Sequence, residues 1–386
     1  MELKKGYKMT EVGVIPEDWE VKQLGSFAKI GSGGTPSRTN PDYWNGDIPW
    51  ITTSEVDSNY ITEATEYISR LGLENSAARV VNKGTLLMAM YGQGKTRGKV
   101  AILGFDASTN QACATIEINK NNNHEFVFYN LSGRYNEIRT LSNTGNQENL
   151  NGQLIREIQV SLPIRESEQT AIATVLSDTN ALISALEKLI TKKRMIKQGT
   201  MQELLKPKGN WKVKTLGDIA EIKTGKKNND DKIEEGLFPF FVRSQNVERI
   251  NSYSFDGEAI LIPGEGNIGG IYHYINGKFD YHQRVYKISN FPTDISGRFV
   301  YYSMIMTFND HAMKNSVKAT VDSLRLPTFQ EFEIYFPPSI SEQKEIVNSL
   351  VDIEGEIALL DKKLEKYKMI KQGLMQVLLT GKIRLI

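Results

Sequence analysis

Two glycine-rich segments contain the residue types of nucleotide-binding loops. Residues 89–96 read AMYGQGKT, close to a phosphate-binding loop, and residues 264–269 read GEGNIG, a GxGxxG match. Such a loop has to follow a strand and open a helix, whose N-terminal N–H groups hold the phosphates. Both segments follow an apolar strand-like run, but RGKVAILGF and GIYHYIN come next and read as second strands. The context therefore argues against nucleotide binding.

Other combinations that could do chemistry are also weak. Residues 40–43 read NPDY but lack the second proline of the amino-methyltransferase tetrapeptide, so we interpret them as a turn. The four histidines, His124, His273, His282 and His311, show no metal-ligand spacing. A single cysteine, Cys113, excludes a Cys-cluster zinc site and an internal disulfide. We expect no catalytic residues, no metal site and no cofactor.

The chain contains an internal duplication. Residues 19–33 read WEVKQLGSFAKIGSG and residues 211–225 read WKVKTLGDIAEIKTG. A second pair of segments begins with SEQ at Ser167 and Ser341 and contains the unbroken run MIKQG in both copies. The glycines of the two phosphate-loop look-alikes also correspond in this repeat, which favours one structural cause, a glycine-rich hairpin loop.

Each copy ends in a long helix with a heptad pattern. The apolar seam positions are Ile172, Leu176, Ile183, Leu186 and Ile190 in the first helix, and Ile346, Leu350, Ile353, Ile357, Leu360, Leu364 and Tyr367 in the second. Their alternating three- and four-residue spacing predicts a coiled coil. Ser167 and Ser341 are placed as N-caps. Each helix has about 38 residues, roughly 57 Å at 1.5 Å per residue. We expect the two helices to pair antiparallel with each other rather than to pack only on their own domains.

The segments between the helices contain short β-rich runs separated by Gly, Asn and Asp turns. We predict an α+β fold in which two mixed α/β domains are joined by two long antiparallel coiled-coil helices, as a pseudo-twofold duplication. The expected ranges are 1–166 for the first domain, 167–206 for the first helix, 207–340 for the second domain, and 341–386 for the second helix with a C-terminal tail.

Composition is that of an ordinary globular protein, with 40% hydrophobic and 24% charged residues. No apolar run is long enough for a membrane span and the first residues do not resemble a secretory signal, so we expect a cytoplasmic protein without a membrane partner. The net charge of +1 does not by itself indicate nucleic-acid binding.

Taken together, the repeat and several short sequence motifs resemble those of the specificity subunit of a type I restriction–modification enzyme. The segments that carry this resemblance are IPEDWEVKQLG, GSGGTPSRTNPDYWNGDIPWI, TNQAC, the two SEQ segments and MIKQGLMQVLLTGKIRL. The resemblance implies a non-catalytic subunit of a bacterial defence complex. It implies binding to double-stranded DNA, to two adenine-N6 methyltransferase subunits and, through these, to endonuclease/translocase subunits. Each target recognition domain would read half of a bipartite site, and the helices would set the spacer.

Candidate DNA-contacting residues follow from side-chain type and loop position. Base edges are read by Arg, Lys, Asn and Gln, with Ser and Thr more permissive, and phosphates attract Lys and Arg. In the first domain the candidates are Thr52, Thr53, Ser54, Gln93, Lys95, Arg97 and Gln147, and in the second Lys226, Lys227, Arg243, Ser244, Gln245, Asn267 and Lys318. The repeat-equivalent pairs Asn110-Gln111 and His282-Gln283 either face DNA or form structural hydrogen bonds.

Two other classes of function stay open at this point. The domains could bind protein while the helices only dimerise, which would make the chain a coiled-coil interaction scaffold. Alternatively, residues 94–96 could serve a nucleotide-dependent enzyme, in which case Lys95 would be essential for function.

Overall fold

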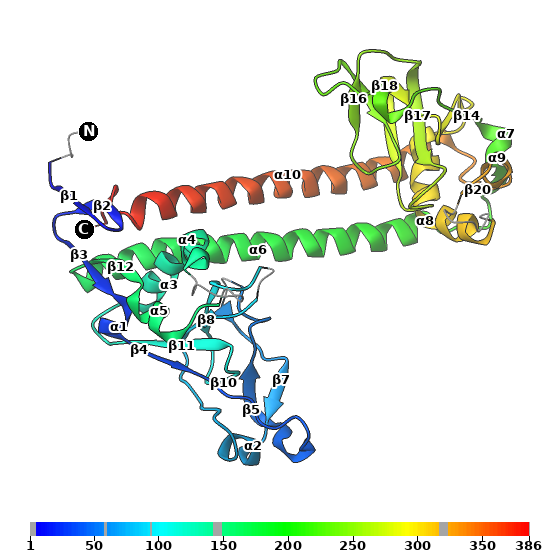
Figure 1. The fold of residues 1–386 in the computed structure, drawn as a ribbon. Helices are drawn as coiled ribbons and strands as arrows, with labels where there is room; N and C mark the ends of the chain where they lie inside the picture. Colours follow the sequence, from blue (N-terminus) through cyan, green and yellow to red (C-terminus); the bar gives the residue numbers. More distant parts are fainter. Residues whose placement is uncertain (1–4, 58–59, 93–94, 142–148, 316–322, 386) are drawn as a thin grey trace. The chain divides into compact units, whose positions relative to one another are not determined.

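A computed structural model describes residues 5–57, 60–92, 95–141, 149–315 and 323–385 of the chain. The chain divides into two compact units. The first comprises Met1–Leu186 and Lys363–Ile386, and the second comprises Glu187–Lys362. Each unit combines a mixed helix-and-sheet part with portions of two 39-residue helices, α6 (Glu166–Leu204) and α10 (Ile340–Leu378) (Figure 1). The predicted fold class, two mixed domains with two long helices, is confirmed.

Short strands build the sheets of the first unit. They are β1 (Tyr7–Thr10), β2 (Gly13–Pro16), β3 (Trp19–Gln23), β4 (Ala28–Ser32), β5 (Trp44–Ile51), β6 (Tyr60–Ile61), β7 (Glu66–Ile68), β8 (Leu86–Ala89), β9 (Val100–Leu103), β10 (Ser108–Thr109), β11 (Cys113–Ile118) and β12 (Gln159–Pro163). The main sheet has the strand order β4-β11-β8-β9-β6, a smaller one has the order β10-β5-β7, and β12 pairs with β3. The helical segments are α1 (Leu24–Phe27), η1 (Pro41–Tyr43), α2 (Arg70–Glu74), α3 (His124–Gly133), α4 (Tyr135–Thr140) and α5 (Gly152–Glu157).

Longer strands build the second unit. They are β13 (Lys212–Thr215), β14 (Glu221–Thr224), β15 (Phe238–Phe241), β16 (Glu248–Ile250), β17 (Phe255–Pro263), β18 (His273–Tyr281), β19 (Val285–Ser289) and β20 (Glu333–Phe336). The main sheet has the order β14-β19-β17-β18-β15-β16, and β13 pairs with β20. The helical segments are α7 (Leu216–Ile219), η2 (Asn229–Asp231), α8 (Gly297–Asn315) and α9 (Leu326–Gln330).

The two units share one strand topology. The order β4-β11-β8-β9 in the first unit corresponds to β14-β19-β17-β18 in the second, with the same antiparallel pairing. The strand β5 has a parallel neighbour in β10 and an antiparallel neighbour in β7, and β15 has the same kinds of neighbour in β18 and β16. The internal repeat found in the sequence is therefore a repeat of the fold.

Within each unit, α6 and α10 lie side by side and run antiparallel. In the second unit, Lys193 forms an ion pair with Glu356, and Lys197 with Glu354, so the partner number falls as the α6 number rises. In the first unit, the Lys371 ammonium donates to the Asn180 side-chain oxygen at 2.7 Å. Ile172, Leu176, Ile183, Leu186, Ile190, Ile346, Leu350 and Leu364 of the seam are buried, and Ile353, Ile357, Leu360 and Tyr367 are half-buried.

Both long helices, α6 and α10, contribute buried side chains to the main hydrophobic core of each unit. In the first unit, Ile172 of α6 and Leu378 of α10 join the cluster that contains Trp19. In the second unit, Met201 of α6 and Leu350 of α10 join the cluster that contains Phe299. Burial of this apolar area is the main favourable term that holds sheets and helices together.

A buried glutamine explains why SEQ occurs twice. Gln169 and Gln343 are almost inaccessible, at 1% and 0%. Each side-chain amide donates to the carbonyl of a proline six residues earlier, Pro163 or Pro337, at 2.9 Å. Each side-chain oxygen accepts from the backbone N–H of Asn123 or Ser296, just before α3 or α8, at 2.9 Å. The motif thus ties a strand end to a helix start in both units.

The expected N-caps are wrong by two residues. The long helices begin at Glu166 and Ile340, so Ser167 and Ser341 lie inside the first turn. The backbone N–H of Gln169 bonds to the carbonyl of Arg165, and that of Gln343 to the carbonyl of Ser339. Assigned helix ends commonly differ by one or two residues because helix ends fray. Among the described residues, no helix is both long and apolar enough to cross a membrane.

We predict that Gln343→Leu destabilises the protein by about 2–6 kcal/mol, because the buried Pro337 carbonyl and the Ser296 N–H each lose a partner at about 1–3 kcal/mol. Chemical unfolding of the whole chain measures this loss. The matched control is Gln330→Leu at an exposed position of α9, which should stay within about 0.5 kcal/mol of the unmodified chain. Equal effects of the two substitutions would contradict the role given to Gln343.

Candidate nucleic-acid interface

Three loops of the second unit bring polar side chains together. Residues 243–245 follow β15, residues 264–267 follow β17, and residues 282–284 connect β18 to β19. Glu265 joins them, because its carboxylate lies 3.3 Å from the Arg243 guanidinium and 3.2 Å from the Arg284 guanidinium. An open hollow of about 360 Å³ lies beside this cluster and is lined by Asn229, Lys232, Val242, Arg243, Ser244, Glu248, Glu265 and Gly266.

Two buried histidines support these loops. The His273 ring nitrogen Nε2 lies 3.0 Å from the Ser244 carbonyl, and His282 Nδ1 accepts from the Arg284 backbone N–H at 2.9 Å. Burial lowers the pKa of both imidazoles, and the Arg243 and Arg284 charges lower that of His282 further, while Glu265 opposes them. The folded second unit therefore favours the uncharged form of both rings, which suits His282 as a hydrogen-bond acceptor.

The remaining candidates of the second unit that the structure describes lie on the loops after β15 and β17 and on the segment after β14. Gln245 and Asn267 are exposed, and Ser244 is half-buried with its hydroxyl donating to the Asn246 carbonyl at 2.8 Å. Lys226 is exposed and Lys227 half-buried, where the Lys227 backbone bridges to His282. Lys318 lies outside the described residues.

In the first unit, the residues after β5 form a hydrogen-bonded turn around Glu55. Its carboxylate accepts from the Thr52 N–H at 2.7 Å and from the Thr65 N–H at 3.0 Å. The Thr52 and Ser54 hydroxyls lie 2.6 Å apart, and Ser54 is exposed. Thr53 is half-buried. The hydroxyls are accessible, but the turn presents no positive charge of its own.

The glycine-rich hairpin of the first unit connects β8 to β9, so a strand and not a helix follows it. Lys95 is exposed in this hairpin, whereas Arg97 is 5% exposed and packs inside. In the second unit, the equivalent loop likewise connects two strands, β17 and β18. Gln93 and Gln147 lie outside the described residues.

The equivalent dipeptides Asn110-Gln111 and His282-Gln283 occupy one kind of turn. The Asn110 side-chain oxygen accepts from the Ala112 and Cys113 N–H groups at 3.1 Å, as His282 Nδ1 accepts from Arg284. The two glutamines are exposed: Gln111 accepts from the Thr35 hydroxyl and Gln283 donates to Asn228, both at 2.5 Å. The first residue of each pair is thus a structural hydrogen-bonder, and the second faces solvent.

This turn explains one glycine in each copy of the repeat. A Cβ atom on Gly33 would lie 1.9 Å from the Thr109 carbonyl oxygen, and one on Gly225 would lie 2.0 Å from the Tyr281 oxygen. Only glycine permits such close approach of two backbone segments.

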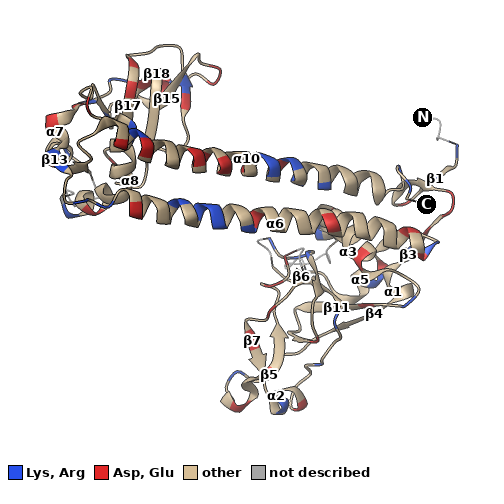
Figure 2. Cartoon of the chain, turned by 180° about the vertical axis from the view of Figure 1, so that it is seen from behind, with Lys and Arg blue, Asp and Glu red and all other residues tan. Residues whose placement is uncertain are grey.

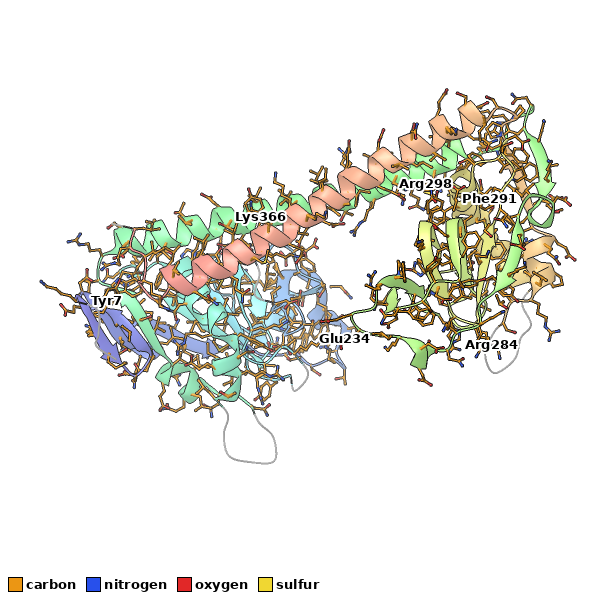
Figure 3. All side chains as sticks on the ribbon, turned by 90° about the horizontal axis from the view of Figure 1, so that it is seen from above. Tyr7, Glu234, Arg284, Phe291, Arg298 and Lys366 are labelled. Carbon is orange, nitrogen blue, oxygen red and sulfur yellow. The ribbon has the colours of Figure 1, made fainter. Side chains whose placement is uncertain are left out.

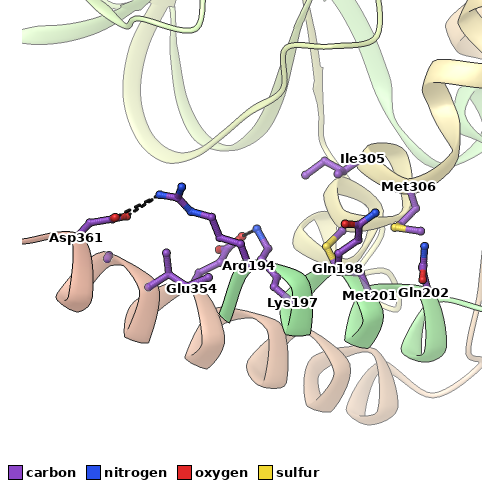
Figure 4. A pocket seen from close by; sticks show the side chains of 11 residues that line it. Arg194, Lys197, Gln198, Met201, Gln202, Ile305, Met306, Glu354 and Asp361 are labelled. Atoms are coloured by element: carbon purple, nitrogen blue, oxygen red, sulfur yellow. Dashed lines mark hydrogen bonds and ion pairs between the residues drawn. The ribbon is translucent and has the colours of Figure 1, made fainter. Parts of the chain in front are cut away.

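A second feature occurs in both units, on the helices. In the second unit, a hollow of about 730 Å³ is lined from α6 by Arg194, Lys197, Gln198, Met201 and Gln202 (Figure 4). In the first unit, a hollow of about 770 Å³ is lined from α10 by Lys368, Lys371, Gln372, Met375 and Gln376. These two sets correspond position by position in the repeat.

Apolar side chains accompany these hollows. Met195 and Met369 are 67% and 66% exposed, and Ile196 and Ile370, which follow them, are also exposed. Basic residues cluster near the middle of each helix (Figure 2). An exposed apolar pair that recurs in both copies, beside a hollow lined by charged and polar side chains, is typical of a protein-docking surface rather than of a solvated helix face.

Sequence reasoning missed Glu265, Arg284 and Glu55. Arg284 could have been found from its position next to His282-Gln283, but the first copy has Ala112 there, so the repeat gave no signal. Glu265 and Glu55 are carboxylates, whereas the side-chain types used to choose candidates were Arg, Lys, Asn, Gln, Ser and Thr. Groups of three or more His, Cys, Asp or Glu that could hold a metal ion do not occur in the described part of the chain.

Comparison with known proteins identifies the relatives of this chain. The profile of the family described as "Type I restriction modification DNA specificity domain" matches residues 16–198 and 208–368. The MjaIX type I restriction enzyme specificity subunit of Methanocaldococcus jannaschii is 29% identical over 289 residues, which are 66% of this chain and 65% of that protein, slightly under two thirds of its length. The MjaVIII specificity subunit of the same organism is 24% identical and the match covers 96% of this chain and 94% of that protein.

Solved structures agree on the fold. The S subunit of a type I restriction–modification system from M. genitalium has a TM-score of 0.69 at 16% identity, covering 98% of both chains. A chain from a type I restriction–modification complex has a TM-score of 0.55 at 14% identity, covering 96% of this chain and 99% of that chain.

We predict that His282→Asn makes stability less dependent on pH, since Asn is the residue that occupies this turn in the first unit. The folded protein holds His282 with a lowered pKa, so below about pH 6.5 the unfolded chain binds a proton that the folded chain does not. Stability of the unmodified chain therefore falls as the pH drops below this value. The free energy of unfolding, measured with denaturant between pH 7.5 and 5.5, should fall less for His282→Asn than for the unmodified chain. An equal fall in both proteins would refute this assignment.

Proposed function

Since this chain belongs to the type I restriction–modification DNA specificity family, we propose that it is the DNA-reading, non-catalytic subunit of such an enzyme. Residues 1–166 and 207–340 are the two target recognition domains, and each reads one half of a bipartite duplex target. The two long helices set the spacer between the half-sites and dock the methyltransferase subunits.

The observation that carries this proposal is one fold with two different sets of loop side chains. The segment after β5 offers the Thr52 and Ser54 hydroxyls, whereas the equivalent segment after β15 offers Arg243 and Gln245. Arg284 has an alanine, Ala112, as its counterpart in the first unit. Shared topology with unlike loop chemistry is what two readers of different sequences require, because base identity is read by side-chain donors and acceptors.

The DNA-contacting residues that we propose are those with accessible side chains on these loops. In the first domain they are Thr52, Thr53, Ser54, Lys95 and Gln111, and in the second Lys226, Lys227, Arg243, Gln245, Asn267 and Gln283. Arg, Asn and Gln would contact base edges, and the lysines would contact phosphates and make binding dependent on salt.

The repeated helix hollows support two copies of one partner. The partners that we propose are two adenine-N6 methyltransferase subunits, which in turn recruit endonuclease/translocase subunits. Lys197 and Lys371 are equivalent in the repeat, and so are their partners Glu354 and Asn180. A surface that is retained in both copies, while the recognition loops differ, suits a partner that binds twice in the same way.

We predict that replacing residues 207–340 with the corresponding domain of an unrelated specificity subunit changes only one half of the target. Affinity of the chimera, assembled with its methyltransferase, should fall about 100-fold or more for the original duplex, since each mismatched pair costs about 1–3 kcal/mol. A duplex that combines the old first half-site with the donor's second half-site should restore binding. Unchanged preference for the original duplex would exclude this function, and absence of DNA binding in the parent complex would favour a protein-interaction scaffold.

We also predict that Met195→Asp and Met369→Asp each remove one methyltransferase subunit. A carboxylate at an apolar contact is unfavourable because it loses hydration on docking. Native mass spectrometry should count two bound subunits for the unmodified chain, one for each single variant and none for the double variant. The control is Leu359→Asp, which changes an equally exposed leucine, at 68%, that lies outside the repeated run. Two bound subunits in the double variant would refute docking at this surface.

A further inference from the structure

The cluster of Arg243, Glu265 and Arg284 contains a carboxylate on loops that we propose to face DNA. Each guanidinium is paired with a different oxygen of Glu265, Arg243 with Oε2 at 3.3 Å and Arg284 with Oε1 at 3.2 Å. Figure 3 shows Arg284 on the side of the second unit that is remote from α10, in contrast to Arg298.

Backbone bonds hold the three loops in register. The Gly264 N–H donates to the Arg284 carbonyl at 2.8 Å, and the Leu324 N–H donates to the Gly264 carbonyl at 2.7 Å. Glu265 also forms an isolated bridge with Ser323. The two histidines described above anchor the other loops at Ser244 and Arg284. Side chains fixed in this way are preorganised for recognition.

Stability alone is a weak reason for this ion-pair cluster. The side chains of Arg243 and Arg284 are 44% and 59% exposed, and that of Glu265 is 24% exposed. Ion pairs that are this accessible contribute little to stability, because water and salt screen them. The ion pair between Arg384 and Glu168 differs from these, because the Glu168 side chain is only 4% exposed and is therefore less screened by water.

The chemistry of the cluster matches one base pair. In the major groove, guanine presents the acceptors N7 and O6, which an arginine fork satisfies with two hydrogen bonds. Cytosine presents the N4 amino donor, which a carboxylate accepts. A negative charge on a DNA-facing loop is repelled by phosphates, so its presence there is explained if it contacts a base amino group.

We propose that this cluster reads a G·C pair in the second half-site, with Arg284 on guanine O6 and N7 and Glu265 on cytosine N4. This inference rests on the proposed function. Arg284 is the more exposed arginine, so it turns to the guanine, while Arg243 stays paired with Glu265 and offsets its charge. The sequence of the first copy has Gln93 at the position of Glu265, and glutamine is the side chain that pairs with adenine.

The test uses the whole chain assembled with its methyltransferase. Competition binding is measured on duplexes in which each base pair of both half-sites is changed in turn. Glu265→Gln should reduce discrimination at one G·C position of the second half-site by about tenfold or more and raise the affinity for adenine there. Arg284→Ala should lose guanine preference at that position, and all other positions should stay within about twofold of the parent complex.

The matched control is Glu248→Gln. Glu248 lines the same hollow and is paired with Lys232 at 3.4 Å, but it does not contact either arginine of the cluster in the described structure. Its base preferences should equal those of the parent complex. Unchanged discrimination in both Glu265→Gln and Arg284→Ala overturns this inference while leaving the proposed function intact. A parent complex without base preference in the second half-site overturns both.

Discussion

The packing of the end of α10 into the core of the first unit is the constraint on which the rest of the molecule depends. Leu378 and Leu379 are buried among residues such as Trp19 and Ile172, more than 200 positions earlier in the chain. Arg384 then bonds to Asp18 and Glu168, and these contacts raise its pKa and lower that of Asp18. Because the first domain is completed by the last helix, the two long helices must pair antiparallel within each unit.

Pairing of the helices separates two kinds of surface. Lys193, Arg194 and Lys197 of α6 meet Glu356, Asp361 and Glu354 of α10, so many of the basic charges on the helices are locally neutralised. The loop surfaces of the second unit, by contrast, keep accessible guanidinium groups. The net charge of +1 is therefore an average over surfaces that differ in their exposed charge. It carries no information about nucleic-acid binding until the surfaces are separated.

Much of the architecture could be predicted because it depends on patterns within one stretch of chain. The heptad spacing gave the long helices, and the duplicated segments gave the two-domain arrangement. The cluster around Glu265 could not be predicted, since it depends on three loops that meet only in the folded protein. Asn110 and His282 are an intermediate case, because the repeat predicts that they are equivalent but not what they do. The folded turn shows that both side chains form structural hydrogen bonds. It also shows that the next residues, Gln111 and Gln283, are exposed.

We propose that two copies of one fold read two different half-sites. Sequencing of adenine methylation in a host that carries this chain with its methyltransferase tests it most directly. We expect one asymmetric bipartite motif, with two short defined blocks of different sequence separated by a gap of fixed length and undefined sequence. A continuous motif, or two identical half-sites in palindromic arrangement, would contradict it.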